Sequence, residues 1–375
     1  MNNSMLMKRI LFSLSVLMAS TSAVAFTPEI KTITLNDGEV IEARLCLPKN
    51  NVKTIVFCIA GTGPTTYLTK RASFNYFDEL ANGFCNEGIA FFSYNRRGCK
   101  TGETPPLFVE VDSARYAKYT PIQEAEDVER MISSLQKDHR FAGCKILLYG
   151  ISEGTIIASL VAERKLVHVD ALLLHGYAHE NMYDIILWQN RGHGVMVMIC
   201  SVFDKDGDHA ISKEEYETEE KKAIRYKAYL FQNMPFDSLD KVKNGFIDVH
   251  DIEEMRMPFH EELMKRVTNN DWMWIRTNYF NITPQWFKSH FELEPNKTRL
   301  LRLNIPIHIF HGAEDANVPV ESVYDLQVRF TVCNKENLII HALEKHNHDL
   351  NFENWLTRKE WSEGFKQLFS VAKEI

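Results

Sequence analysis

Short, nearly continuous runs of apolar residues alternate along the chain with stretches in which apolar residues recur every three or four positions. The first pattern predicts strands and the second predicts helices. The predicted strands cover residues 31–35, 40–47, 52–60, 89–94, 145–149, 171–174, 305–310 and 338–342. The predicted helices cover residues 73–86, 122–137, 153–163, 320–333 and 352–372. Because most of the strands are apolar throughout, we expect an α/β fold whose mostly parallel sheet is covered by helices on both faces.

The alternation of strands and helices stops between residues 181 and 299, where the sequence is charged, aromatic and helical. We therefore predict a core formed by residues 26–180 and 300–375, with residues 181–299 inserted as a helical segment. Aromatic side chains in the second half of this insertion are candidates for helix packing or for the wall of an apolar pocket. They are Trp272, Trp274, Tyr279, Phe280, Trp286 and Phe287.

The N-terminus has the pattern of a signal peptide. Lys8 and Arg9 precede an apolar run at residues 10–18, and Ala23 and Ala25 form a small-residue cleavage signal. We predict that residues 1–25 are a signal peptide that is cleaved after Ala25, and that the protein is secreted or periplasmic. No apolar run is long enough for a transmembrane helix, so no transmembrane anchor is expected.

Composition narrows the classes of function. The 375 residues include 43 Lys and Arg against 50 Asp and Glu, which gives a net charge of -7. Nothing supplies the positive charge that neutralises phosphates, so we expect no nucleic-acid partner. The seven cysteines show no C-x-x-C spacing, which gives no support to a zinc or thioredoxin-like site.

One strand-to-helix connection carries a serine between glycines. Residues 150–154 read Gly-Ile-Ser-Glu-Gly, so Ser152 lies at a sharp turn that requires small neighbours. A nucleophilic serine needs a base to accept its proton and an acid to orient that base. Asp315 follows the strand at 305–310 and His348 follows the last strand, in the order Ser, Asp, His of an α/β-hydrolase. Glu314 is the competing acid and His346 is the competing base.

A glycine-rich loop follows the strand at residues 52–60. Such a loop allows a backbone N–H to face the oxygen of a substrate, and the second donor is the N–H that follows the nucleophile. The predicted oxyanion donors are therefore the backbone N–H groups of Thr62 and Glu153. His175 and His311 also follow strands, and we interpret both as hydrogen-bonded structural side chains.

These motifs resemble those of the α/β-hydrolase superfamily, in its esterase and serine-peptidase-like branch. Residues 61–64 resemble the H-G-x-G-P loop, residues 150–154 the G-x-S-E-G turn, residues 348–351 the D-H-D-L-N tail and residues 94–98 the D-x-R-G turn. The chain departs from the pattern at Ala60, where the family has His, and at Asn95, where it has Asp. The resemblance covers residues 32–177 and 304–375, implies Asp315 and His348 as acid and base, and implies that the insertion is a cap.

Within the insertion, residues 204–215 closely match an EF-hand loop. Calcium prefers six to eight oxygen ligands, and the loop offers them at the required positions. The predicted ligands are Asp204, Asp206, Asp208, the carbonyl of Ala210, Ser212 acting through water, and Glu215. His209 occupies the position where glycine is usual, because the backbone there needs a positive φ. The alternative interpretation is a solvated acidic turn.

A second, weaker loop begins at residue 240. Its candidate ligands are Asp240, Asn244, the carbonyl of Phe246, Asp248 and Asp251. Val242 has no oxygen at the third position, and Asp251 is shorter than the usual Glu. Ile247 can pair with Ile211 of the first loop, so we predict a paired EF-hand and leave open whether the second loop holds metal.

Taken together, these motifs predict a secreted serine hydrolase that cleaves an ester, thioester or related acyl bond of a small-molecule substrate. Its predicted cofactor is Ca²⁺, and its EF-hand helices are expected to lie over Ser152. The two alternatives are a serine peptidase with the same machinery and a non-catalytic calcium-binding protein on a hydrolase scaffold.

Overall fold

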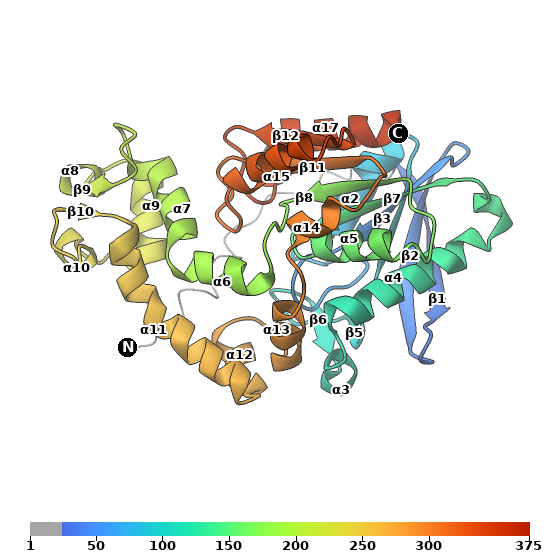
Figure 1. The fold of residues 1–375 in the computed structure, drawn as a ribbon, viewed down its shortest axis with the longest axis horizontal. Coiled ribbons are helices and arrows are strands. Elements are labelled where there is room, and N and C mark those ends of the chain that lie inside the picture. Colours follow the sequence, from blue (N-terminus) through green and yellow to red (C-terminus); the bar gives the residue numbers. More distant parts are fainter. Residues whose placement is uncertain (1–24) are drawn as a thin grey trace.

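The computed structural model describes residues 25–375, so the predicted signal peptide lies outside the described residues except for Ala25. An eight-stranded sheet forms the centre, in the order β1-β2-β4-β3-β7-β8-β11-β12. β1 and β2 are antiparallel to each other and β2 is antiparallel to β4, whereas every later pair is parallel. The mostly parallel α/β sheet predicted from the sequence is therefore confirmed (Figure 1).

The observed strands agree with the predicted ones to within a few residues, except that β1 begins earlier. Their bounds are β1 Phe26–Thr34, β2 Val40–Pro48, β3 Thr54–Ile59, β4 Ala90–Tyr94, β7 Lys145–Ile151, β8 Ala171–His175, β11 Ile307–Gly312 and β12 Leu338–Leu343. A short antiparallel pair, β5 (Cys99–Thr101) and β6 (Val109–Val111), was not predicted because its strands have only three residues each.

Helices cover both faces of the sheet, as the apolar strands require. α2 (Tyr76–Asn86) and α17 (Glu363–Glu374) pack in one hydrophobic cluster. α4 (Pro121–Gln136), α5 (Gly154–Arg164) and α15 (Glu321–Val332) pack in the other. The remaining core elements are α3 (Ser113–Tyr116), a 3-10 turn at His139–Phe141, and α16 (Glu353–Arg358).

The single helix predicted over residues 352–372 is wrong. The chain forms α16 and α17 instead, because Lys359 adopts a left-handed conformation with φ of 57° and ends α16. Ser362 then caps the start of α17 by accepting a hydrogen bond from the Phe365 N–H. No helix within residues 25–375 is long and apolar enough to cross a membrane, and none of the seven cysteines, all of which lie in this range, is in a disulfide.

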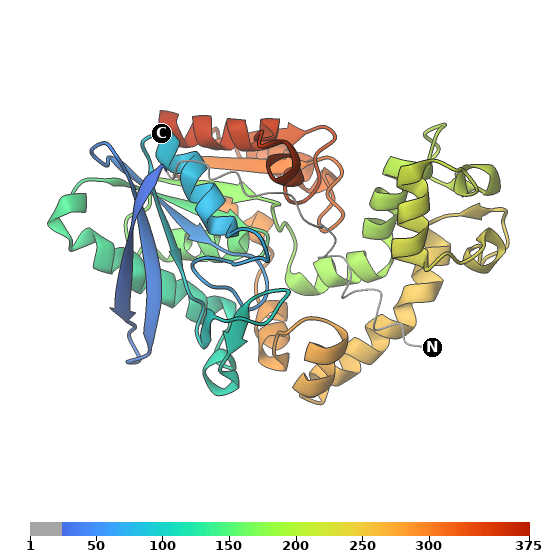
Figure 2. The same cartoon turned by 180° about the vertical axis from the view of Figure 1, so that it is seen from behind.

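The insertion between β8 and β11 is helical, as predicted, apart from two strands of two residues. In chain order its elements are α6 (Met182–Asn190), α7 (His193–Phe203), β9 (Ile211–Ser212), α8 (Lys213–Tyr216), α9 (Lys221–Phe231), α10 (Phe236–Leu239), β10 (Phe246–Ile247), α11 (Val249–Thr268), α12 (Trp272–Asn278), α13 (Pro284–Phe291) and α14 (Asn296–Leu300). The elements from α7 to β10 form a lobe with its own apolar core at the opposite end of the molecule from β1 (Figures 1 and 2). The long helix α11 leads from this lobe back toward α12 and α13.

Candidate active site

The turn between β7 and α5 holds Ser152 in a strained conformation. Ser152 has a φ of 54°, in the left-handed region that L-residues rarely adopt. A Cβ on Gly150 would lie 2.4 Å from the carbonyl oxygen of Gly154, and a Cβ on Gly154 would lie 2.1 Å from that of Ile59. Both glycines are therefore required by close packing, which is the physical reason for their spacing around the serine.

Asp315 and His348 lie side by side after β11 and β12. The Nδ1 of His348 is 2.7 Å from the Oδ2 of Asp315. The other oxygen of Asp315 accepts hydrogen bonds from the N–H groups of Asn317 at 2.8 Å and Val318 at 3.0 Å. These contacts fix a fully buried carboxylate, and they orient the imidazole with its Nε2 on the opposite side.

His348 and Asp315 each stabilise the charged form of the other. Burial alone would lower the pKa of His348, but the charge of Asp315 and its hydrogen bond outweigh burial and raise that pKa to about 9. Burial alone would raise the pKa of Asp315, but His348 lowers it to about 2. Asp315 is therefore ionised at neutral pH, where it stabilises a proton on His348.

The backbone after β8 connects Ser152 with His348. The N–H of Ser152 donates to the carbonyl of His175 at 2.8 Å. Next in the chain, a Cβ on Gly176 would lie 2.6 Å from the Cε1 of His348, so the imidazole packs directly on this glycine. Among the described residues the hydroxyl of Ser152 has no hydrogen-bond partner; such contacts often tighten only when substrate is bound.

Neither competing residue occupies the place of the acid or the base. The imidazole of His346 forms no hydrogen bond with Asp315, and its Nδ1 lies 2.8 Å from the carbonyl oxygen of Glu344. The carboxylate of Glu314 has no hydrogen bond to any described residue. Both ring nitrogens of His175 and His311 have polar partners: Tyr149 and the His348 carbonyl for the first, the Tyr177 N–H and the Val318 carbonyl for the second.

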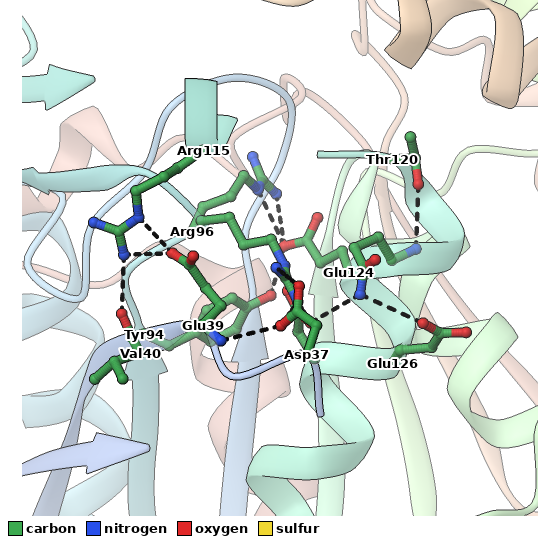
Figure 3. Close-up of polar contacts among 12 residues, drawn as sticks. Asp37, Glu39, Val40, Tyr94, Arg96, Arg115, Thr120, Glu124 and Glu126 are labelled. Atoms are coloured by element: carbon green, nitrogen blue, oxygen red, sulfur yellow. Dashed lines mark hydrogen bonds and ion pairs between the residues drawn. The ribbon is translucent and has the colours of Figure 1, made fainter. Parts of the chain in front are cut away.

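The glycine-rich loop after β3 is held by a buried arginine that the sequence motif did not single out. The guanidinium of Arg96 donates to the carbonyls of Gly61 at 2.9 Å, Ala60 at 3.3 Å, and Gly63. Its charge is paired with Glu124 at 3.0 Å (Figure 3). With its carbonyls held by Arg96, the loop lies against Ser152, since a Cβ on Gly61 would be 3.3 Å from the Cβ of that serine.

The two predicted oxyanion donors are available for a ligand. Among the described residues, neither the N–H of Thr62 nor that of Glu153 has a hydrogen-bond partner. The side chain of Glu153, by contrast, is buried and hydrogen-bonded to Tyr119, Trp286 and His290. Sequence reasoning missed these contacts, because two of the three partners lie in the insertion more than 130 positions along the chain.

The two acidic loops of the insertion pair as the sequence predicts. β9 and β10 are antiparallel, with Ile211 opposite Ile247. His209 and Gly245 have φ of 65° and 89°, so both loops adopt the left-handed conformation at their sixth position. These loops lie in the distant lobe, at the opposite end of the molecule from β1 (Figure 1), and the expectation that their helices cover Ser152 stays a prediction.

The first loop fits a cation better than the second. Asp204, Asp206 and Asp208 each offer a carboxylate oxygen, and these oxygens lie within 4.8 Å of one another. The last carboxylate of each loop accepts hydrogen bonds from backbone N–H groups, Glu215 in the first loop and Asp251 in the second, so this contact does not distinguish them. In the second loop, Val242 supplies no side-chain oxygen.

The helix that enters the first loop, α7, packs against the loop that carries Asp315. A Cβ on Gly194, in α7, would lie 2.1 Å from the carbonyl oxygen of Ala316, next to Asp315. The side chain of Gln189 donates to the carbonyl of Asn317 at 2.9 Å. The distant lobe is therefore packed, through its first helix, against the loop that carries Asp315.

The aromatic residues of the insertion pack as a helical core. Trp286 and Phe287 are fully buried with Tyr279 in the main hydrophobic cluster, and Trp272, Trp274 and Phe280 pack against it. A cavity of about 530 Å³ lies elsewhere, between α6 and α15. None of the six aromatic side chains lines that cavity, so helix packing accounts for their positions.

Comparison with known proteins identifies the fold. No protein family profile and no curated protein sequence matches the chain. A carboxyl esterase of Bacillus coagulans superposes with a TM-score of 0.53 at 14% identity, over 93% of this chain and 98% of that protein. An esterase of Pyrococcus furiosus gives 0.51 at 12% identity, over 96% and 95%. The α/β hydrolase GrgF of Penicillium sp. sh18 gives 0.50 at 14% identity, over 93% and 100%. Identities this low establish architecture alone, and the chain therefore has the α/β-hydrolase fold that its motifs predict.

Proposed function

We propose that the chain is an exported serine hydrolase that cleaves an ester, thioester or related acyl bond of a small molecule. One observation carries the proposal. Asp315 and His348 are joined at 2.7 Å, at the same edge of the sheet as a serine held at a positive φ. Export is proposed from the N-terminal sequence.

In the proposed reaction, the Oγ of Ser152 attacks the acyl carbon while Nε2 of His348 accepts its proton. Asp315 holds Nδ1–H and stabilises the imidazolium that forms. The N–H groups of Thr62 and Glu153 bind the oxyanion, and His348 then protonates the leaving group. Water repeats the sequence on the acyl-enzyme and releases Ser152.

The insertion is proposed to bind calcium in its first loop through Asp204, Asp206, Asp208, Ala210, Ser212 and Glu215. The three adjacent aspartates repel one another, and a divalent cation removes that repulsion. We propose that binding orders the lobe and stabilises the chain, while bond cleavage uses only residues of the core.

The test is labelling with a fluorophosphonate probe, followed by a panel of acyl substrates. We expect the native chain to be labelled and to hydrolyse small esters, and Ser152→Ala to lose both properties while its melting temperature is unchanged. Labelling with preferred cleavage of peptides would favour the peptidase alternative. A folded chain that is not labelled would refute the proposed hydrolase and favour a binding protein.

A further inference from the structure

The residue after Ser152 has a buried carboxylate that the reaction above does not use. Glu153 is 1% exposed, and both of its oxygens lie 2.6 Å from the hydroxyl of Tyr119. One oxygen also accepts from Nε1 of Trp286 at 2.7 Å and from Nε2 of His290 at 2.7 Å. Tyr119 precedes α4 in the core, whereas Trp286 and His290 belong to α13 in the insertion. This carboxylate therefore joins two parts of the chain that are distant in sequence.

The network holds a negative charge in place. Burial alone would raise the pKa of Glu153, but the hydrogen bond and charge of His290 and the charge of Arg96 lower it below its ordinary value. A buried carboxylate is tolerated only when donors compensate for its lost hydration, so removing one donor disturbs the others.

The same residue supplies one of the two predicted oxyanion donors. Its N–H belongs to the peptide that links it to Ser152, whose φ of 54° is strained. The side chain and the N–H of Glu153 share one Cα, so a side chain fixed by three donors also restricts the orientation of that peptide. A shift of α13 would move the carboxylate of Glu153 and, with it, the N–H of the same residue.

We propose that Glu153 is a positioning residue, whose side chain couples the seating of α13 to the orientation of the oxyanion-binding N–H. This inference rests on the proposed serine hydrolase and adds a role for the insertion in it. The cap helix α13 thereby contributes to transition-state stabilisation without touching the substrate.

The experiment compares Glu153→Gln and Tyr119→Phe with a matched control, Tyr177→Phe. The hydroxyl of Tyr177 is buried and has no hydrogen-bond partner among the described residues, so its removal breaks no such contact. Active sites are counted with the fluorophosphonate probe, and kcat and KM for a small ester are expressed per active site. Inhibition by a trifluoromethyl ketone, which forms a tetrahedral adduct with the serine, reports on the oxyanion site.

We expect kcat to fall about ten- to hundredfold in Tyr119→Phe and further in Glu153→Gln, with little change in KM. The Ki of the ketone should rise by the same factor as kcat/KM falls, and Tyr177→Phe should match the native chain. If both variants keep native kcat per active site and only the melting temperature falls, the network is merely structural and the proposal is overturned. Tyr119→Phe alone decides the matter if Glu153→Gln does not fold. A native chain that is neither labelled nor active would instead refute the serine hydrolase, and this inference with it.

Discussion

Replacing Asp315 by Asn should move the rise of activity with pH to a lower pH. The substitution keeps the size of the side chain but removes the charge that lies 2.7 Å from Nδ1 of His348. In the native chain this charge and hydrogen bond raise the pKa of His348 to about 9, against burial, which acts in the opposite direction. Without the charge, burial dominates, and the pKa of His348 should fall below its ordinary value of 6.5.

The magnitude follows from these two values. A fall of the pKa from about 9 to below 6.5 corresponds to about 3 kcal/mol or more of lost stabilisation of the imidazolium. His348 acts as a base only when neutral, so native kcat/KM should rise about tenfold from pH 7 to pH 8 and level off above pH 9. The variant should already be level at pH 7, at a plateau about 10⁴-fold lower because the imidazole is no longer held in the correct tautomer.

The assay is kcat/KM for a chromogenic ester between pH 5.5 and 10, expressed per fluorophosphonate-titrated site. Glu314→Gln is the matched control, since it removes the neighbouring carboxylate and should leave the native profile in place. If Asp315→Asn retains an alkaline limb near pH 9, the charge of Asp315 does not set the pKa of His348. If only Glu314→Gln moves the limb, the acid has been assigned to the wrong residue.

Three further predictions concern the base, the glycine-rich loop and calcium. His348→Ala should lower kcat about 10⁴-fold or more, whereas His346→Ala should leave it within about threefold in the same assay; the reverse order would move the base to His346. Arg96→Lys keeps a positive charge near Glu124 but loses the guanidinium that binds several loop carbonyls. The kcat per site should therefore fall about tenfold or more, while circular dichroism shows a folded protein. An unchanged kcat would mean that the loop keeps its shape without Arg96. Calcium at 100 times its Kd should stabilise the native chain by about 2.7 kcal/mol in thermal unfolding. Glu215→Gln should remove this gain and Asp251→Asn should keep it; a gain that survives in Glu215→Gln would exclude the first loop as the site.

The sequence predicts those features that depend on local constraints. The turn at Ser152 requires glycine two positions before and after it, and this spacing is visible without knowledge of the fold. The places of Asp315 and His348 after two core strands are also visible in the sequence. The carboxyl ends of parallel strands share one edge of the sheet, and this brings the two residues to the same edge. The pairing of Ile211 with Ile247 was likewise predictable from equivalent positions in two loops.

The features that the sequence does not predict depend on contacts between distant segments. The sequence predicts a role only for the backbone N–H of Glu153, because the partners of its side chain, Trp286 and His290, lie 133 and 137 positions away. Arg96 belongs to a recognised turn, but nothing in that turn indicates which carbonyls it binds. The break between α16 and α17 depends on one left-handed residue, Lys359, in a stretch whose apolar spacing suits a continuous helix.

The two ends of the insertion lie side by side, at residues 178–179 and 296–297, and this affects how the sheet assembles. Residues 176–306, a connection of 131 residues, separate the neighbouring strands β8 and β11. Closing a flexible loop of this length instead of a crossover of about 12 residues would cost about 2 kcal/mol more in chain entropy. The side chain of Asn296 donates to the carbonyl of Ala178 at 3.1 Å, and the N–H of Lys297 donates to the carbonyl of His179 at 3.0 Å. Once the insertion has folded, these bonds hold its two ends together. β11 and β12 then join the sheet through a connection whose ends are already close together. The length of the insertion therefore adds little to the folding barrier of the core.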